Sequence, residues 1–376
     1  MKITVSRHVS VLQIAFVMLF VSYFIPDLAK SNTMIEQILR YGSYVMFLYG
    51  GGKKSLESNQ MLRFALFEFL AIAISLFTRD FYWCIIITII LLVSKQKMEW
   101  TFNVGFSILL ISIILVILCC VVGILPNLIT NRLNDTVNRY TLGFYHSNVL
   151  PLCYMYLFLF RIVIKKILSK KEVLLWILIG FGIYYACRSR TSYGCILVLS
   201  FMNIVAPIIR SKKILNLTKI IAQLSPVIAS IFSISITLQQ GKYDVKMYAI
   251  NEFFSGRFAI AYHYIRKFGI HAINFMSGSK YAAGQVILDN GFLYTGIRYG
   301  LLFLVFYFWL FYRLGKRFEN SFLLLTVLIV LSFANMVDND LYSYGFLPFL
   351  MLAVGKQTNN KILLNLNYSR QSRERS

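Results

Sequence analysis

Long apolar segments follow one another along most of the chain, separated by short polar connections. Each segment is close to the ~20 residues that cross the ~30 Å hydrocarbon core of a bilayer as a helix. The pattern predicts about twelve membrane-spanning helices over residues 8–26, 34–52, 62–78, 81–94, 101–124, 142–162, 173–188, 191–209, 219–238, 291–312, 321–338 and 341–355. We therefore expect an all-α integral membrane protein that forms a single polytopic domain over residues 1–376.

Lysine and arginine are abundant in every second connection, which predicts an orientation. The positive-inside rule places the basic set in the cytoplasm. This set comprises Lys2 and Arg7; Lys53, Lys54 and Arg63; Lys95 and Lys97; Lys165, Lys166, Lys170 and Lys171; Arg210, Lys212 and Lys213; Arg313, Lys316 and Arg317; and the basic tail 356–376. The alternation predicts that both termini are cytoplasmic.

One connection, residues 239–290, is far longer than the others, and the alternation places it outside the membrane. Within it, residues 252–268 have the pattern of an amphipathic helix with Phe254, Phe258, Tyr262 and Ile265 on one face. We expect this large extracytoplasmic loop to be ordered and to lie on the outer membrane surface.

Composition supports a membrane protein and narrows the meaning of the charge. The chain is 58% apolar and 14% charged, with 38 Lys and Arg against 15 Asp and Glu and a formal net charge of +23. Because the positive charges follow the connections, they indicate orientation and contact with anionic headgroups, and no nucleic acid partner is expected. The six cysteines lie in or beside apolar segments without C-x-x-C spacing, so they are predicted to be buried hydrophobic residues.

The basic, apolar N-terminus resembles a signal peptide, but no small-residue cleavage site follows it. We interpret it as a retained first helix. Inside the spans, Glu68 is the most central charged residue, and Glu36 and Arg40 have the spacing of an ion pair on one helix face. Charged groups at such depth are functional candidates by default.

Polar residues are richer at the predicted outer ends of the spans. Arginine is prominent there, and its guanidinium group suits phosphate oxygens and keeps its charge. The set is Arg132, Arg139, His146, Asn148, Arg188, Arg190, Arg257, His263, Arg266, Asp289, Asn290, Arg298, Asp338 and Asp340. An anionic substrate is the expectation, although each arginine taken alone also fits a structural or headgroup contact.

Motifs for nucleotides and metals are missing from the sequence. It contains no P-loop, no dinucleotide-binding G-x-G-x-x-G, no H-E-x-x-H, no G-x-S-x-G and no D-x-D pair. We expect no cofactor and no metal site. An enzyme of this kind needs a donor that arrives already activated, and a lipid-linked diphosphate is such a donor.

Four segments, in order, resemble a known family. TLGFYHSNVLP resembles the GF-x-H-P-N segment of Wzy-type polysaccharide polymerases and their O-antigen ligase relatives, with Ser147 where the family often has proline. CRSRTS at 187–192 resembles the S-R-T segment, FFSGRFAIAYHYI at 253–265 the S-G-R segment, and LDNGFLYTGIRYG at 288–300 the D-N segment. The match covers roughly residues 140–300.

The resemblance implies a glycosyltransferase in the bacterial cytoplasmic membrane that acts on undecaprenyl-diphosphate-linked oligosaccharide, independent of nucleotides and metals. It implies His146, Arg257 and Asp289 as catalytic residues, with His146 or Asp289 as the base. The expected substrate-binding residues are Arg139, Asn148, Arg188, Arg190, Arg266 and Asn290. A flippase and a chain-length regulator are expected partners.

Two other functions fit the same features. An O-antigen-ligase-like transferase uses the same donor with a different acceptor, and the sequence does not separate it from a polymerase. A lipid-linked oligosaccharide flippase or other transporter also has about twelve helices and clustered arginines, although inverted repeats and broken helices near mid-membrane are not visible.

Overall fold

The computed structural model describes residues 7–28, 33–57, 61–78, 82–93, 98–130, 138–209, 211–240, 245–254, 256–274, 288–337 and 345–355. Within these ranges the chain forms fifteen helices and one two-stranded hairpin. The expectation of a predominantly helical protein is confirmed.

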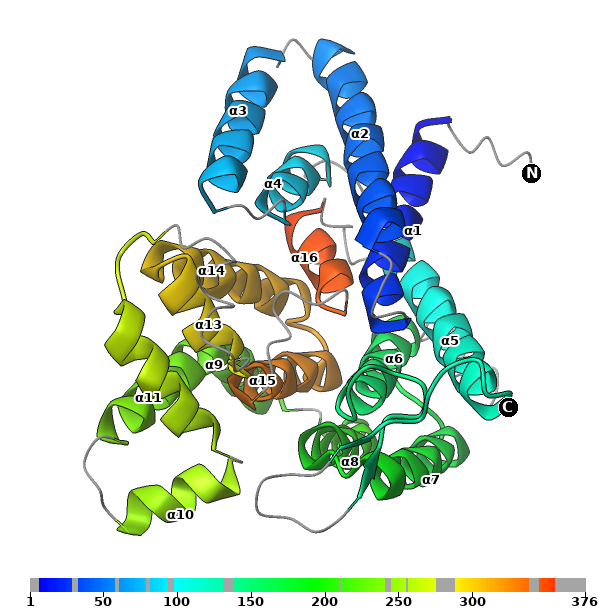
Figure 1. The fold of residues 1–376 in the computed structure, drawn as a ribbon, viewed down its shortest axis with the longest axis vertical. Coiled ribbons are helices and arrows are strands. Elements are labelled where there is room, and N and C mark those ends of the chain that lie inside the picture. The colour runs from blue at the N-terminus through cyan, green and yellow to red at the C-terminus, as the bar shows by residue number, and fades with distance from the viewer. Residues whose placement is uncertain are drawn as a thin grey trace.

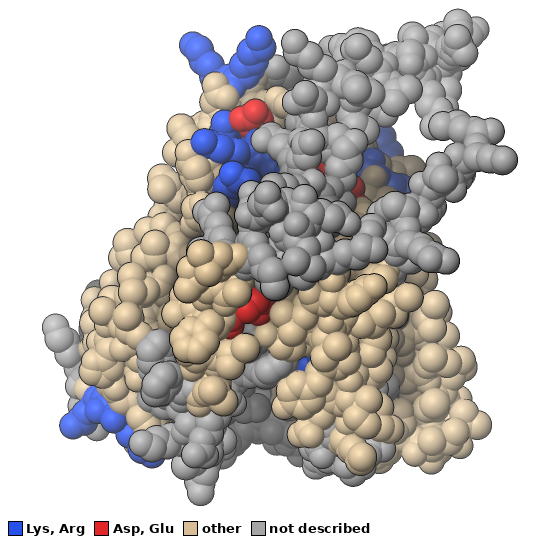
Figure 2. All heavy atoms as spheres, turned by 90° about the horizontal axis from the view of Figure 1, so that it is seen from above, with Lys and Arg blue, Asp and Glu red and all other residues tan. Residues whose placement is uncertain are grey.

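Two helices are long and apolar enough to cross a membrane, α5 (Trp100–Val121) and α9 (Lys212–Gln239). Shorter apolar helical stretches run over Val11–Ser22, Arg190–Val205 and Phe322–Val337. Much of the surface of α5 is apolar and exposed, including Ile111, Leu115 and Leu118. Figure 2 shows the same character on one face of the molecule, where most of the described atoms belong to uncharged residues and the described Lys and Arg side chains lie in small groups.

The first four helices form one region, at the top of Figure 1. Helix α1 (Arg7–Leu28) lies along α2 (Thr33–Glu57), and α3 (Met61–Thr78) packs against α4 (Tyr82–Val93). On α2, Arg40 donates to Glu36, so the predicted ion pair is confirmed. Glu68 is buried on α3.

Helices α6 (Val149–Lys165), α7 (Lys170–Cys187) and α8 (Arg190–Val205) form a second region beside α5. Most side chains of α6 are buried. Ser169 accepts a hydrogen bond from the backbone N–H of Glu172 and caps α7, while Glu172 bonds Arg161 at 2.7 Å. A turn of only Arg188 and Ser189 joins α7 to α8, so the ends of these helices lie together.

The segment before α6 differs from the prediction. A helix was expected from residue 142, but α6 begins at Val149, and Ile129–Thr130 (β1) pairs antiparallel with Arg139–Tyr140 (β2). Leu142 and Gly143 have positive φ angles of 50° and 91°, which no helix accommodates. A Cβ atom at Gly143 would lie 2.9 Å from Cys120 Cβ, so glycine permits this turn to lie on α5.

The large loop is partly helical, as expected, with α10 (Val245–Phe253) and α11 (Arg257–Phe268), and its residues 275–287 lie outside the described ranges. The predicted apolar face is partly wrong: Phe258, Ala261 and Tyr264 are the buried residues of α11. Gly256, with a φ of 80°, separates the two helices and changes the direction of the chain.

The predicted span 291–312 is two helices, α13 (Gly291–Arg298) and α14 (Leu301–Arg317). At the break, the backbone N–H groups of Leu301 and Leu302 donate to the carbonyl oxygens of His271 and Ala272. Carbonyl oxygens of the large loop therefore accept the hydrogen bonds that a continuous helix would make internally at this point. The span 321–338 corresponds to α15 (Phe322–Val337).

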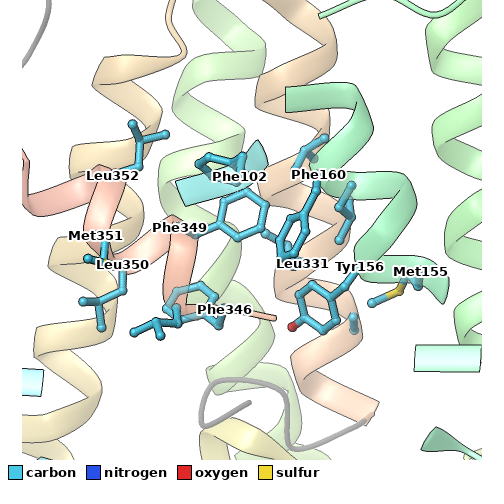
Figure 3. Close-up of a cluster of buried hydrophobic side chains, with 14 of the residues drawn as sticks. Phe102, Met155, Tyr156, Phe160, Leu331, Phe346, Phe349, Leu350, Met351 and Leu352 are labelled. Carbon is cyan, nitrogen blue, oxygen red and sulfur yellow. The ribbon is translucent and has the colours of Figure 1, made fainter. Parts of the chain in front are cut away.

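The last described helix, α16 (Leu347–Val354), occupies the centre of the molecule, and the beginning of its predicted span lies outside the described ranges. Phe349 points between Phe102 of α5 and Phe160 of α6, with ring centroids 5.0 and 6.2 Å away (Figure 3). Arg317 donates to the carbonyl oxygens of Leu352 and Gly355 at its end. The N-terminal and C-terminal halves thus share one core.

Candidate functional site

Arg139 joins three parts of the chain. The residue lies on β2 and is 5% exposed. Its Nε atom donates to the carbonyl oxygen of Cys187 at 3.1 Å, and its Nη2 atom donates to Asn148 Oδ1 at 2.6 Å. These charge-assisted bonds connect the GFYHSN turn to the end of α7. Arg139 and Asn148 are therefore bonded to each other, and together they hold the turn before α6 against the end of α7.

His146 lies in the turn before α6, not in the helix as the sequence predicted. Its Nδ1 atom accepts a hydrogen bond from the backbone N–H of Asn148 at 3.1 Å. An imidazole that accepts at Nδ1 carries its proton on Nε2 when it is neutral. This arrangement prepares His146 to donate a hydrogen bond from Nε2 and leaves Nδ1 occupied.

The next two arginines lie where α7 is joined to α8. Arg188 ends α7 with a φ of 56°, and its guanidinium group lies 4.8 Å from the centre of the Tyr185 ring. Arg190 is the first residue of α8 and is exposed. Arg188 directly follows Cys187, whose carbonyl oxygen Arg139 bonds, and Arg190 lies two residues further along the chain.

A small aromatic hollow lies beside this turn, between α6, α7 and α8. The rings of Tyr184 and Tyr193 stack at 5.2 Å, and the hydroxyl oxygens of Ser189 and Ser192 are 3.5 Å apart. The hollow also touches Tyr154 and has a volume of about 10 Å³, enough for about one water molecule. Sequence reasoning missed Tyr154, Tyr184 and Tyr193, because they come from three helices and form no local motif.

Arg257 and Asp289 form a second group, which joins α11 to the segment before α13. Arg257 Nε lies 3.7 Å from Asp289 Oδ2, with the two side chains 12% and 39% exposed. Partial burial raises the pKa of Asp289 above its ordinary value, and the charge of Arg257 opposes this shift. The S-G-R and D-N segments are therefore in contact through the ion pair of Arg257 and Asp289.

Asn290 and Arg266 have other surroundings. Asn290 is 1% exposed and caps α13, because its Oδ1 accepts from the N–H of Leu293 at 3.0 Å and its Nδ2 donates to Ser233 Oγ at 3.1 Å. Both polar groups of its amide serve the fold. Arg266 is exposed on α11, 6.0 Å from the centre of the Tyr262 ring.

The site residues thus form two groups: the turn group of Arg139, His146, Asn148, Arg188 and Arg190, and the loop group of Arg257 and Asp289. Helix α15 packs against α8 on one side and against α9 and α13 on the other, and so lies between them (Figure 1). The bonds described above lie within each group: Arg139 with Asn148 in the turn group, and Arg257 with Asp289 in the loop group.

Helix α15 also contributes a residue that sequence reasoning missed. Asn335 is fully buried, its Nδ2 donates to the carbonyl oxygen of Leu331 at 2.7 Å, and its Oδ1 has no hydrogen-bond partner within the described part of the chain. A polar residue in the apolar run LIVLSFANMV was the available signal.

The other predicted polar residues are distributed as follows. Arg132, Asp338 and Asp340 lie outside the described ranges. His263 is exposed on α11, and Arg298 donates to the hydroxyl group of Tyr294 on α13. Across the ranges that the structure covers, no three His, Cys, Asp or Glu side chains come together as a metal site would require.

Comparison with known proteins found no family model, no curated protein and no solved structure that matches this chain.

Proposed function

We propose that this chain is a multi-pass protein of the bacterial cytoplasmic membrane that polymerises a surface polysaccharide. Its substrate is an oligosaccharide repeat unit on undecaprenyl diphosphate. The enzyme moves the growing glycan from one carrier onto the next lipid-linked unit at the outer face of the membrane. The reaction uses no nucleotide, because the diphosphate bond of the donor already supplies the leaving group.

The proposed topology has about twelve spans, both termini in the cytoplasm, and α10 and α11 on the outer side. Support comes from α5 and α9, which are long and apolar enough to span a bilayer. It also comes from the apolar side chains that α5 exposes, which suit contact with lipid. In this setting a flippase and a chain-length regulator are the expected partners.

One observation carries the proposal: the four motif segments are in contact in pairs. Arg139 bonds Cys187 and Asn148, which brings the GFYHSN segment against the CRSRTS segment across 48 residues of sequence. Arg257 faces Asp289, which brings the S-G-R segment against the D-N segment. Four segments that resemble those of one family, in the same order, would be expected to contact one another in this way if they build neighbouring parts of one site.

The chemistry follows from these groups. An acceptor hydroxyl oxygen bonds to the anomeric carbon, the bond from that carbon to the diphosphate oxygen breaks, and the hydroxyl proton passes to a base. Arg257, beside Asp289, would stabilise the charge on the departing diphosphate, and Arg188 and Arg190 would bind the substrate from the turn group. Asp289 is the better base, since its raised pKa strengthens it, and His146 would orient the acceptor through Nε2–H.

A test uses the host strain with this gene deleted and replaced by variants. Arg257→Ala and Asp289→Asn should each abolish long glycan, lowering polymer by about 100-fold or more if each supplies a typical 10²–10⁴-fold effect. Gel electrophoresis of surface polysaccharide measures chain length, and immunoblotting of membranes measures the amount of protein.

Lys171→Ala, at an exposed position at the start of α7, is the matched control and should leave chain length unchanged. Single repeat units should accumulate outside the membrane in the inactive variants. Long glycan that is made but not attached to its final acceptor would indicate a ligase, and repeat units retained inside would indicate a flippase. Normal chain length in both variants would contradict the site.

A further inference from the structure

Glu68 is a buried carboxyl group far from both site groups along the chain. It lies near the middle of α3 and is 6% exposed. Tyr44 of α2 donates a hydrogen bond to its Oε2 atom at 3.0 Å, and the hydroxyl group of Thr88 in α4 lies beside the same carboxyl group. Tyr44 and Thr88 are themselves buried. Three helices therefore meet at one carboxyl group.

Among the described side chains, the neighbours of Glu68 on α2 and α4 provide hydrogen bonds, and none forms an ion pair with its carboxyl group. Helix α3 packs against α4 and α2. From residue 85 to residue 90, α4 presents isoleucines and Thr88, and on α2 the charged group nearest to Tyr44 is Arg40, which pairs with Glu36. Among the described side chains, Glu68 forms no ion pair.

One oxygen atom of this carboxyl group is buried without a described hydrogen bond to replace those it makes with water. Glu68 Oε1 is buried and has no hydrogen-bond partner among the residues that the structure describes. Moving an ionised carboxylate from water into such an interior carries a large desolvation cost. Buried carboxyl groups without a countercharge therefore become neutral by binding a proton.

We propose that Glu68, with Tyr44 and Thr88, forms a proton-binding site in which the carboxyl group is neutral at physiological pH. Oε2 accepts from Tyr44, and Oε1 carries the proton. A divalent cation fits poorly, because these three side chains offer few oxygen atoms, whereas Mg²⁺ and Ca²⁺ take about six or more. Release of the proton requires water to reach the interior of α2, α3 and α4, so proton exchange is coupled to separation of these helices.

Dicyclohexylcarbodiimide, an apolar reagent for protonated carboxyl groups, tests this proposal on the purified full-length protein. The carboxyl oxygen bonds to the central carbodiimide carbon, the proton moves to a nitrogen, and the adduct rearranges to a stable N-acylurea without a leaving group. Peptide mass spectrometry should find the adduct on Glu68 at neutral pH. Its yield should fall about tenfold for each pH unit above the point at which Glu68 ionises.

The controls use the same three helices. Glu36, paired with Arg40, should remain unlabelled under the same conditions. Glu68→Gln should remove the adduct and leave the thermal unfolding midpoint near that of the wild type, because the amide is neutral and of the same size, whereas Glu68→Ala should lower it. Tyr44→Phe removes a donor that favours the ionised form, so labelling should persist to higher pH.

Three results would overturn the proposal. The first is a Glu68 that stays unlabelled at neutral pH while the reagent modifies other carboxyl groups of the chain. The second is labelling that sodium chloride suppresses at constant ionic strength, which would assign the site to Na⁺. The third is strong destabilisation by Glu68→Gln, which would mean that the folded state uses the charge.

Discussion

Asp289 combines a partly buried carboxyl group with one basic partner among the described residues, Arg257. Burial raises its pKa, and Arg257, 3.7 Å away, compensates only in part. A carboxyl group with a raised pKa binds protons more tightly in the folded state than in the unfolded state. The folded protein therefore loses stability as the pH rises from the ordinary value of 3.8 through the raised value.

Asp289→Asn should accordingly make the protein more stable at neutral pH, since the amide carries no charge to desolvate. Well below pH 3.8, where the carboxyl group is protonated in both states, the variant and the wild type should unfold at the same temperature. Differential scanning fluorimetry of the purified protein across this pH range measures the effect. Asn335→Asp offers a contrast, because it adds a buried charge and should destabilise. An Asp289→Asn protein that melts earlier at neutral pH would mean that the bond to Arg257 dominates.

At the scale of elements, the break between α13 and α14 defines how the large loop is anchored. Gly300 has a φ of 103°, and a Cβ atom there would lie 2.6 Å from the carbonyl oxygen of Ala272. That oxygen accepts from the N–H of Leu302 at 3.1 Å, so loop and helix are joined through their backbones. Asp289 lies just before α13, and α13 ends at this junction. The position of Asp289 therefore depends on the junction.

Gly300→Ala should therefore destabilise the protein by about 2 kcal/mol or more, since it combines an unfavourable φ with a backbone clash. Gly182→Ala on α7 is the matched control, because among the described residues no atom lies within 4 Å of the point that its methyl group would occupy. That change should be neutral or stabilising by up to about 1 kcal/mol. Thermal melting of both variants decides the point, and equal midpoints would refute the role given to the junction.

The helices were predictable from sequence wherever a long apolar run decided the structure, as for α5, α9 and α15. The turn at 142–148 and the break at 300 were not, because they depend on positive φ angles and on backbone bonds to distant segments. Within the candidate site, sequence identified the arginines, His146 and Asp289 by residue type. It did not predict that Arg139 and Asn148 bond each other or that Asn290 caps α13, since these roles arise from tertiary contacts.

At the scale of the whole molecule, α16 unites regions that are distant in sequence. Phe346 and Phe349 enter a cluster with Phe102, Tyr156 and Phe160 (Figure 3). Gly345 lies directly against the Tyr156 ring, where a Cβ atom would overlap it. Arg313 and Arg317 of α14 donate to the carbonyl oxygens at the end of α16 and satisfy groups that the helix itself leaves open.

Phe349→Ala should cost about 3–5 kcal/mol, the typical result of emptying a buried aromatic site. Phe333→Ala, which removes the same side chain at a position that is 58% exposed on α15, should cost far less. Chemical denaturation in detergent, followed by tryptophan fluorescence, compares the two. Similar losses for both variants would show that α16 does not complete the core.

The central place of α16 also bears on how the protein is made. The ribosome completes α5 and α6 long before it reaches Phe349, so the aromatic pocket between Phe102 and Phe160 stays open until the last part of the chain is made. A chain that stops before residue 345 would form its earlier helices and still lack the residue that closes them together. Cellular quality control would then meet an open aromatic surface, and such fragments should be degraded rather than accumulate.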